Sequence, residues 1–311
     1  AFNVKDAYGR NFSVLKGFDP RVDGYLYGYN FQEQWSRAFE LDPELVFVTG
    51  WNEFIAGQWL PEHSWNGFPF SFVDQYNWNC SRDIEPNKSW GDKGDAYYLQ
   101  LVDNVRKFKG MTPPEKASAP QTIKIGKADG WDGVAPYFAS YKGNTMHRDH
   151  RGRYDQYYTN NTGRNDIVQA KVANDGTYLY FYVKTASDIT PYKDKNWMRL
   201  FINVIGSDKP NWEHFQYMIN GEVTDETTTS LAVCRGNWNW ETQQEISYRV
   251  EGSEMELAIP MASLGIKNVR DFKIDFKWID NAVSKGDIQE CLTDGDAAPN
   301  GRFRYRYQFK K

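Results

Sequence analysis

A cluster of polar and aromatic side chains follows a short apolar run near residue 50. The carboxylate of Glu53 stands there beside four further candidate site residues: Trp51, Asn52, Gln58 and Trp59. A carboxyl group transfers protons at a reacting bond, an amide hydrogen-bonds hydroxyl groups, and an indole offers an apolar face to a sugar ring. The pattern therefore predicts a pocket for carbohydrate chemistry, with Glu53 as the catalytic acid.

Glycoside hydrolysis usually needs two carboxyl groups that flank the scissile bond. Asp74 lies in the same Trp-, Asn- and Pro-rich connection and is a candidate substrate-binding residue. Asp74, Asp83 and Glu85 are candidates for the second carboxylate. For Asp83 and Glu85, hydrogen bonding within the loop is the ordinary alternative. For Glu53 the alternative is a surface or helix-capping carboxylate.

A second aromatic candidate lies much later in the chain. Trp238 and Trp240 are two residues apart, so on a strand both would face the same side. Asn237 and Asn239 flank Trp238 and are poor core residues, which favours an exposed aromatic shelf that binds substrate, with core packing as the alternative. Three other tryptophans lie in or beside apolar runs and are predicted to be structural: Trp197, Trp212 and Trp278.

The elements that would position Glu53 are predicted to be a helix, a turn and a strand. Apolar residues from Phe31 to Phe39 recur at helical spacing, and the dipeptide Asp42-Pro43 ends that helix. Residues 45–48 form a continuous apolar run, typical of a strand buried on both faces. A second helix is predicted over residues 95–108. A buried strand, a long loop and a helix form one unit of an α/β barrel or a doubly wound sheet.

Residues 111–120 are rich in proline and small side chains and are predicted to be a linker. Apolar and polar residues alternate after it, which predicts antiparallel strands over residues 122–125, 168–173, 178–184, 198–204, 215–219, 245–250, 255–259, 272–278 and 303–309. The predicted domains are therefore residues 1–110, with the strand and helix units, and residues 121–311, an all-β sandwich.

Two sets of motifs resemble known families. Thr49-Gly-Trp-Asn-Glu-Phe, Ser81-Arg-Asp-Ile-Glu-Pro and the run from Gly94 to Asn104 resemble the end of the family 99-like glycoside hydrolases, which are (β/α)8 barrels. The motifs at residues 125–133, 174–183, 256–265 and 278–281 resemble a family 9-type carbohydrate-binding module, a DOMON-like β-sandwich.

The resemblance implies a multi-domain chain: the C-terminal strand and helix units of an incomplete (β/α)8 barrel, followed by an antiparallel sandwich. It also implies part of a secreted glycoside hydrolase with an appended glycan-binding domain. A complete barrel needs about 250 residues, so its missing portion is an expected partner. Family 99 enzymes use a pair of glutamates; Gly50 and Ala56 stand three residues to either side of Glu53, so that pair is not reproduced.

The composition narrows the classes of partner. Aromatic residues make up 16% of the chain, which suits a polysaccharide or glycan partner, and the net charge of −4 gives no basic surface for nucleic acid. No run of 18 apolar residues is present, so no membrane span is predicted. The first residues, Ala1-Phe2-Asn3, suggest processing and export, and hence a secreted, periplasmic or cell-surface location.

The sequence predicts no metal ligand set of zinc type and requires no cofactor. The oxygen-rich loops around Asp149, Asn165-Asp166 and Asp294-Gly-Asp296 suit Ca²⁺, with ordinary turn chemistry as the alternative. Two other functions stay open at this point. One is a non-catalytic polysaccharide-binding protein. The other is a structural sandwich whose aromatic residues dock a protein.

Overall fold

The computed structural model describes residues 9–53, 81–144, 147–151, 157–283, 285–293 and 295–311. The chain divides into two compact units, Ala1–Pro113 and Pro114–Lys311, and the division falls within residues 111–120. Among the described residues, no helix has the length and apolar character needed to cross a membrane.

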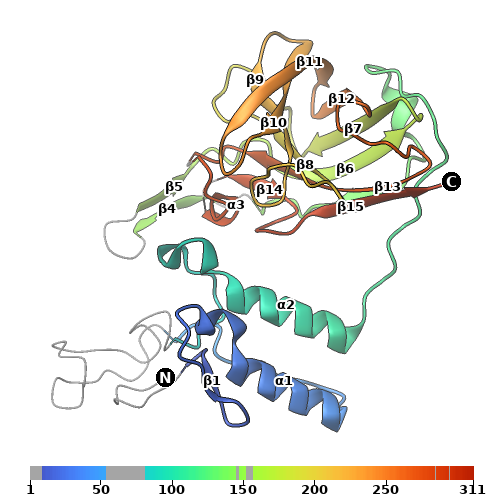
Figure 1. The fold of residues 1–311 in the computed structure, drawn as a ribbon. Helices are drawn as coiled ribbons and strands as arrows, with labels where there is room; N and C mark the ends of the chain where they lie inside the picture. Colours follow the sequence, from blue (N-terminus) through green and yellow to red (C-terminus); the bar gives the residue numbers. More distant parts are fainter. Residues whose placement is uncertain (1–8, 54–80, 145–146, 152–156, 284, 294) are drawn as a thin grey trace. The chain divides into compact units, whose positions relative to one another are not determined.

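The first unit is built on two helices, α1 (Tyr29–Leu41) and α2 (Ala96–Lys109), which lie side by side (Figure 1). The predicted apolar face of α1 packs on α2: the Phe31 ring lies 5.4 Å from Tyr97, and the Trp35 ring lies 6.4 Å from Phe108. Trp35 is 4% exposed and forms the centre of this small core. The hairpin β1 (Phe12–Ser13) and β2 (Gly17–Phe18) and two 3-10 helices, η1 (Gly24–Tyr27) and η3 (Lys88–Lys93), complete the unit.

The prediction of barrel units was wrong. Residues 45–48 form no strand, and the side chains of Leu45 and Phe47 are 78% and 83% exposed. Every strand pairing in the described residues is antiparallel, whereas a (β/α)8 barrel requires parallel strands. An apolar run is buried as a parallel strand only when neighbouring strands and helices cover it, and the described residues place no such strand beside this run.

The second unit is dominated by one continuous antiparallel sheet. Its strand order is β14-β13-β8-β9-β10-β11-β12-β7-β6-β3, and β15 also pairs with β13. The bounds are β3 (Tyr137–Ala139), β6 (Ile167–Asn174), β7 (Tyr178–Thr185), β8 (Arg199–Val204), β9 (Tyr217–Val223), β10 (Thr228–Cys234), β11 (Trp240–Glu251), β12 (Glu254–Pro260), β13 (Asp271–Asp280), β14 (Asp296–Ala298) and β15 (Tyr305–Lys310). Outside this sheet lie the hairpin β4 (Arg148–Arg151) and β5 (Tyr157–Asn160), the 3-10 turn η4 (Ala128–Trp131) and the short helix α3 (Glu290–Thr293).

The predicted sandwich of two separate sheets is replaced by a single sheet that curls into a half-barrel (Figure 1). Strand β11 pairs with both β10 and β12, so the two halves are continuous, and the register shift between Leu231 and Ala232 falls at this joint. A bulge increases strand bend and twist, which suits a curled sheet. Alternation predicts strands but does not say whether two strand groups share a hydrogen-bonded joint.

Two cores cover opposite faces of the same strands. On β13, Ile274, Phe276 and Trp278 point into the main core inside the curl. Ile279 belongs instead to a second cluster with Phe201 of β8, because successive residues of a strand face opposite sides. Loops that follow β8, β10 and β13 close over this outer cluster, so the outer surface of these strands is covered.

Candidate functional site

The predicted site in the first unit borders a hollow of about 300 Å³, here called the Glu53 hollow. The backbone N–H of Glu53 donates to Oδ1 of Asp83 at 2.8 Å, and Asn52 donates its amide to Oε2 of Glu85 at 2.7 Å. Trp51 is 47% exposed, with its ring 6.0 Å from that of Tyr98. The wall consists of Asn30, Phe31, Gln34, Trp35, Ala38, Val46, Phe47, Val48, Thr49, Gly50, Glu53, Arg82, Ile84 and Tyr97.

This hollow presents a single carboxylate among its described lining residues, that of Glu53. Trp51 and Asn52 lie beside Glu53 in the chain but do not line the hollow. Gln58, Trp59 and Asp74 lie outside the described residues. The described geometry therefore supplies one carboxyl group, whereas glycoside hydrolysis usually uses a pair.

Trp238 and Trp240 do not stand together on one strand as the sequence predicted. Trp238 lies in the turn between β10 and β11, Trp240 begins β11, and their rings meet edge to face at 5.8 Å. Both rings contact Phe201, and Trp238 lies 4.5 Å from Trp212. The two indoles are partly buried at the edge of the outer cluster, so each uses part of its surface for packing.

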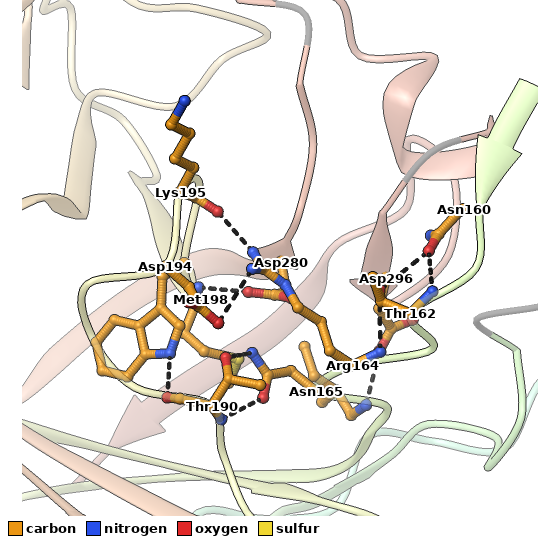
Figure 2. A network of polar contacts seen from close by, with 12 residues as sticks. Asn160, Thr162, Arg164, Asn165, Thr190, Asp194, Lys195, Met198, Asp280 and Asp296 are labelled. Atoms are coloured by element: carbon orange, nitrogen blue, oxygen red, sulfur yellow. Dashed lines mark hydrogen bonds and ion pairs between the residues drawn. The ribbon is translucent and has the colours of Figure 1, made fainter.

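A polar network in the second unit centres on Arg164 (Figure 2). Its Nε donates to Oδ2 of Asp280 at 2.9 Å, its Nη2 donates to the carbonyl of Lys195 at 2.6 Å, and its Nη1 lies 3.3 Å from Oδ2 of Asp194. The other oxygen of Asp280 accepts the N–H of Met198 at 2.9 Å. Burial raises the pKa of Asp280, while Arg164 and the Met198 N–H oppose that rise. The network therefore binds the segment before β8 to the end of β13.

The same segment is held at a second point. Asn165 donates to Thr190 Oγ1 at 3.0 Å and accepts the Thr190 N–H at 2.9 Å, while the indole N–H of Trp197 donates to the Thr190 carbonyl at 2.8 Å. Trp197 is 3% exposed and packs in the main core. Hydrogen bonds thus hold this segment at Thr190, Lys195, Trp197 and Met198, and the last two residues are also buried.

This fixed segment forms one wall of a hollow of about 340 Å³, here called the Arg199 hollow. The opposite wall comes from β9. Leu200 of β8 pairs with Ile219 of β9, and the strands are antiparallel. The residue before Leu200, Arg199, therefore lies across from the residue after Ile219, Asn220. The lining residues are Tyr192, Lys193, Asp194, Lys195, Asn196, Trp197, Arg199, Asn220, Gly221 and Val223. Arg199 also lines a small depression beside Trp238, whose ring lies 5.9 Å from the guanidinium carbon.

Arg199 is partly buried and carries an incompletely satisfied guanidinium group. Nη2 donates to Oδ1 of Asn196 at 2.8 Å, while the buried Nε has no hydrogen-bond partner. The buried Oδ1 of Asn220 also lacks a partner, although the Asn220 amide donates to the Met198 carbonyl at 2.6 Å. Burial lowers the pKa of Arg199, and the nearby Asp280 partly offsets this effect.

Three residues around this hollow have positive φ angles: Asn196 at 56°, Met198 at 38° and Asn220 at 60°. Asparagine tolerates this region, whereas an unbranched apolar residue such as methionine rarely adopts it. The surrounding hydrogen bonds hold these conformations in place, and such strained positions cluster at binding sites. Sequence reasoning missed this site; the only local signal was an arginine at the start of an apolar strand run.

The loops proposed for Ca²⁺ use several of their oxygens in hydrogen bonds within the protein, although the buried Oδ1 of Asp166 has no partner among the described residues. Oδ1 of Asp149 accepts the Tyr157 hydroxyl at 2.8 Å, and Oδ2 of Asp166 accepts the Gly143 N–H at 2.7 Å. Oδ2 of Asp296 accepts the Ile167 N–H at 2.6 Å, and Asp294 lies outside the described residues. Within the described ranges, no group of three His, Cys, Asp or Glu side chains is placed to hold a metal ion.

Comparison with known proteins adds little to this geometry. No family model and no curated protein matches the chain. A crystal structure from Bacteroides uniformis, whose name describes a proposed carbohydrate-binding protein, aligns with a TM-score of 0.34 and 11% identity. The alignment covers 63% of this chain and all of that one. A TM-score of this size does not establish a shared fold.

Proposed function

We propose that the second unit is a carbohydrate-binding domain whose site is the Arg199 hollow and the Trp238 ring beside it. The observation that carries the proposal is the mixture of groups around the Arg199 hollow and the small depression that shares Arg199 with it. Arg199, Asn196 and Asn220 bring hydrogen-bonding side chains, and Tyr192 and Trp238 bring aromatic rings. Sugars present hydroxyl groups at the ring edge and C–H groups on the ring face, and this mixture complements both.

Rigidity supports the same proposal. The segment that lines the hollow is held by Arg164 and by the Asn165–Thr190 pair before any ligand arrives. A preformed wall lowers the entropy cost of binding, because the segment does not have to become ordered when the ligand arrives. This matters most where the individual contacts, such as hydrogen bonds to sugar hydroxyl groups, are weak.

The test is a glycan array followed by calorimetric titration of the best ligand. We expect Tyr192→Ala and Trp238→Ala to weaken binding by about tenfold or more, since each removes a ring beside the hollow. Tyr178→Ala is the matched control, because Tyr178 lies at the far end of β7 and is 38% exposed. Equal affinity in all three variants, or no glycan bound by the wild-type protein, would contradict the proposal.

A narrower second proposal concerns hydrolysis in the first unit, and the observation that favours it is that Glu53 lines an open hollow beside Trp35 and Tyr97. We propose a proton-donor role for Glu53, with the second carboxylate supplied from outside the described residues, where Asp74 lies. Glu53→Gln should abolish release of reducing sugar while leaving glycan binding by the second unit intact. Hydrolysis at the wild-type rate in Glu53→Gln would exclude this role.

Export of the protein to a secreted, periplasmic or cell-surface location is part of the same proposal, because the polysaccharides of cell walls and of the surroundings lie outside the cytoplasm. Fractionation of the producing cells, with detection of this chain in each fraction, tests it. Detection in the cytoplasmic fraction alone would contradict the proposed location.

A further inference from the structure

We propose that the Arg199 hollow recognises an acidic saccharide, a hexuronate unit of a polysaccharide whose carboxylate pairs with Arg199. This inference rests on the proposed carbohydrate-binding function and names the class of sugar.

Within the part of the chain that the structure describes, Arg199 has no carboxylate partner of its own. Two nearby acids are engaged by Arg164: Asp280, whose side chain is 0% exposed, at 2.9 Å and Asp194 at 3.3 Å. A third acid, Asp287, borders the small depression beside Trp238 but forms no ion pair with Arg199. Among the described residues, no carboxylate forms an ion pair with the Arg199 guanidinium, which donates one hydrogen bond, to the Asn196 amide oxygen. A partly buried cation without an anion is costly, and a ligand carboxylate offsets that cost by forming charge-assisted hydrogen bonds.

The described residues around the hollow carry an excess of positive charge. Its lining contains three cationic side chains, Lys193, Lys195 and Arg199, and one acidic side chain, Asp194. Asp194 is already beside Arg164, and Figure 2 shows the Lys195 side chain extending away from the network while its carbonyl faces Arg164. Both lysines are exposed, so they add positive potential at the rim. This local excess is opposite in sign to the net charge of −4.

The size and lining of the hollow suit a saccharide better than a simple anion. The hollow of about 340 Å³ is far larger than one inorganic anion needs, since a water molecule takes up about 30 Å³ in the liquid. Amide groups of Asn196 and Asn220 and the ring of Tyr192 border the same space, and hydroxyl groups and ring faces suit these partners. A planar guanidinium also matches a carboxylate better than an ammonium group does.

The experiment compares acid and ester forms of the same sugars by calorimetric titration. The probes are trimers of galacturonate, mannuronate and glucuronate, each with its methyl ester, which keeps the ring but removes the charge. We expect at least one acid trimer to bind about tenfold or more tightly than its ester, with affinity that falls as NaCl rises. Dextran sulfate and inorganic phosphate serve as competing anions.

Substitutions of Arg199 test whether this residue causes the difference in affinity between acid and ester. Arg199→Met should reduce acid binding to the level of the ester, and Arg199→Lys should retain an intermediate affinity because it keeps the charge without the planar fork. The control is Arg270→Met, an exposed arginine adjoining the opposite end of β13, about 30 Å away by strand geometry. The comparison of acid with ester in the wild-type protein needs no variant, so it holds even if Arg199→Met is poorly folded.

The outcomes are distinct. Equal affinity for acids and esters, or undiminished acid binding in a folded Arg199→Met, overturns this inference and leaves a neutral carbohydrate-binding site. Dextran sulfate binding more tightly than every uronate assigns the charge to a sulfate ester and overturns the hexuronate. Phosphate binding as tightly as the acid trimers overturns the saccharide. Failure of every glycan, charged or neutral, refutes the proposed function itself.

Discussion

Replacement of Arg164 by methionine should strongly destabilise the second unit and release the segment that lines the Arg199 hollow. Arg164 is 15% exposed at its side chain and Asp280 is 0% exposed, so the two form a buried ion pair. The methionine is similar in length but makes none of the three polar contacts to Asp280, Asp194 and the Lys195 carbonyl. Asp280 then keeps the Met198 N–H but loses its cation.

The magnitude follows from this burial. Removing one partner of a buried ion pair costs about 3–5 kcal/mol, because an uncompensated charge remains inside the protein. For a unit of this size, about 1 kcal/mol corresponds to roughly 2–4 °C, so we expect Tm to fall by about 10 °C. Arg235→Met is the control: Arg235 and Glu241 form a pair with side chains 51% and 62% exposed, and we expect no measurable change in Tm.

Calorimetry measures the Tm, and hydrogen exchange of peptides covering residues 190–200 shows whether the loss is local to the hollow. The double variant Arg164→Met/Asp280→Asn should recover much of the loss, since it removes the stranded charge. The deficit of the single variant should shrink as pH falls, because burial raises the pKa of Asp280 and protonation then removes the charge. A loss below about 1 kcal/mol, or a double variant no more stable than the single one, would refute the buried-pair reasoning.

Two other predictions concern buried polar groups in the second unit. Lys277 is 0% exposed and donates to the carbonyls of Pro299 and Phe303, and burial lowers its pKa from 10.5 to about 8. The unfolded chain therefore binds more protons above pH 8, so the free energy of unfolding should rise by about 1 kcal/mol from pH 8 to 9. The raised pKa of Cys291, about 11 against 9.0 in the unfolded chain, acts in the opposite direction from about pH 8 upward, so the Lys277 contribution is read as the difference between the wild-type protein and Lys277→Met. Urea titrations at both pH values check this, and the same rise in Lys277→Met would contradict it. Trp131→Phe should cost about 1–3 kcal/mol, because the Trp131 indole N–H donates to Oε1 of Glu256, a residue 6% exposed, at 2.9 Å. An unchanged Tm by calorimetry would show that this hydrogen bond contributes nothing.

Local periodicity was sufficient for most elements. The apolar spacing around Trp35 predicted α1, the pattern over residues 95–108 predicted α2, and alternation predicted strands such as β7, β8 and β13. These patterns are readable because a helix or strand places side chains on one face by geometry alone. The same reading predicted a buried strand at residues 45–48, where Leu45 and Phe47 are exposed. Burial depends on neighbours, and an apolar run does not specify them.

At the candidate site too, the sequence identified residues by type and spacing, but not the contacts between distant segments. Sequence alone identified the aromatic residues Trp238 and Trp240 as notable, and it identified the polar groups around Glu53, because residue type and spacing are visible in one dimension. Arg199 was not recognised, since its importance comes from contacts that cross the fold: Arg164, far along the chain, occupies the carboxylates that would otherwise neutralise it. Which charges are paired, and which are left for a ligand, is decided only when distant segments are packed together.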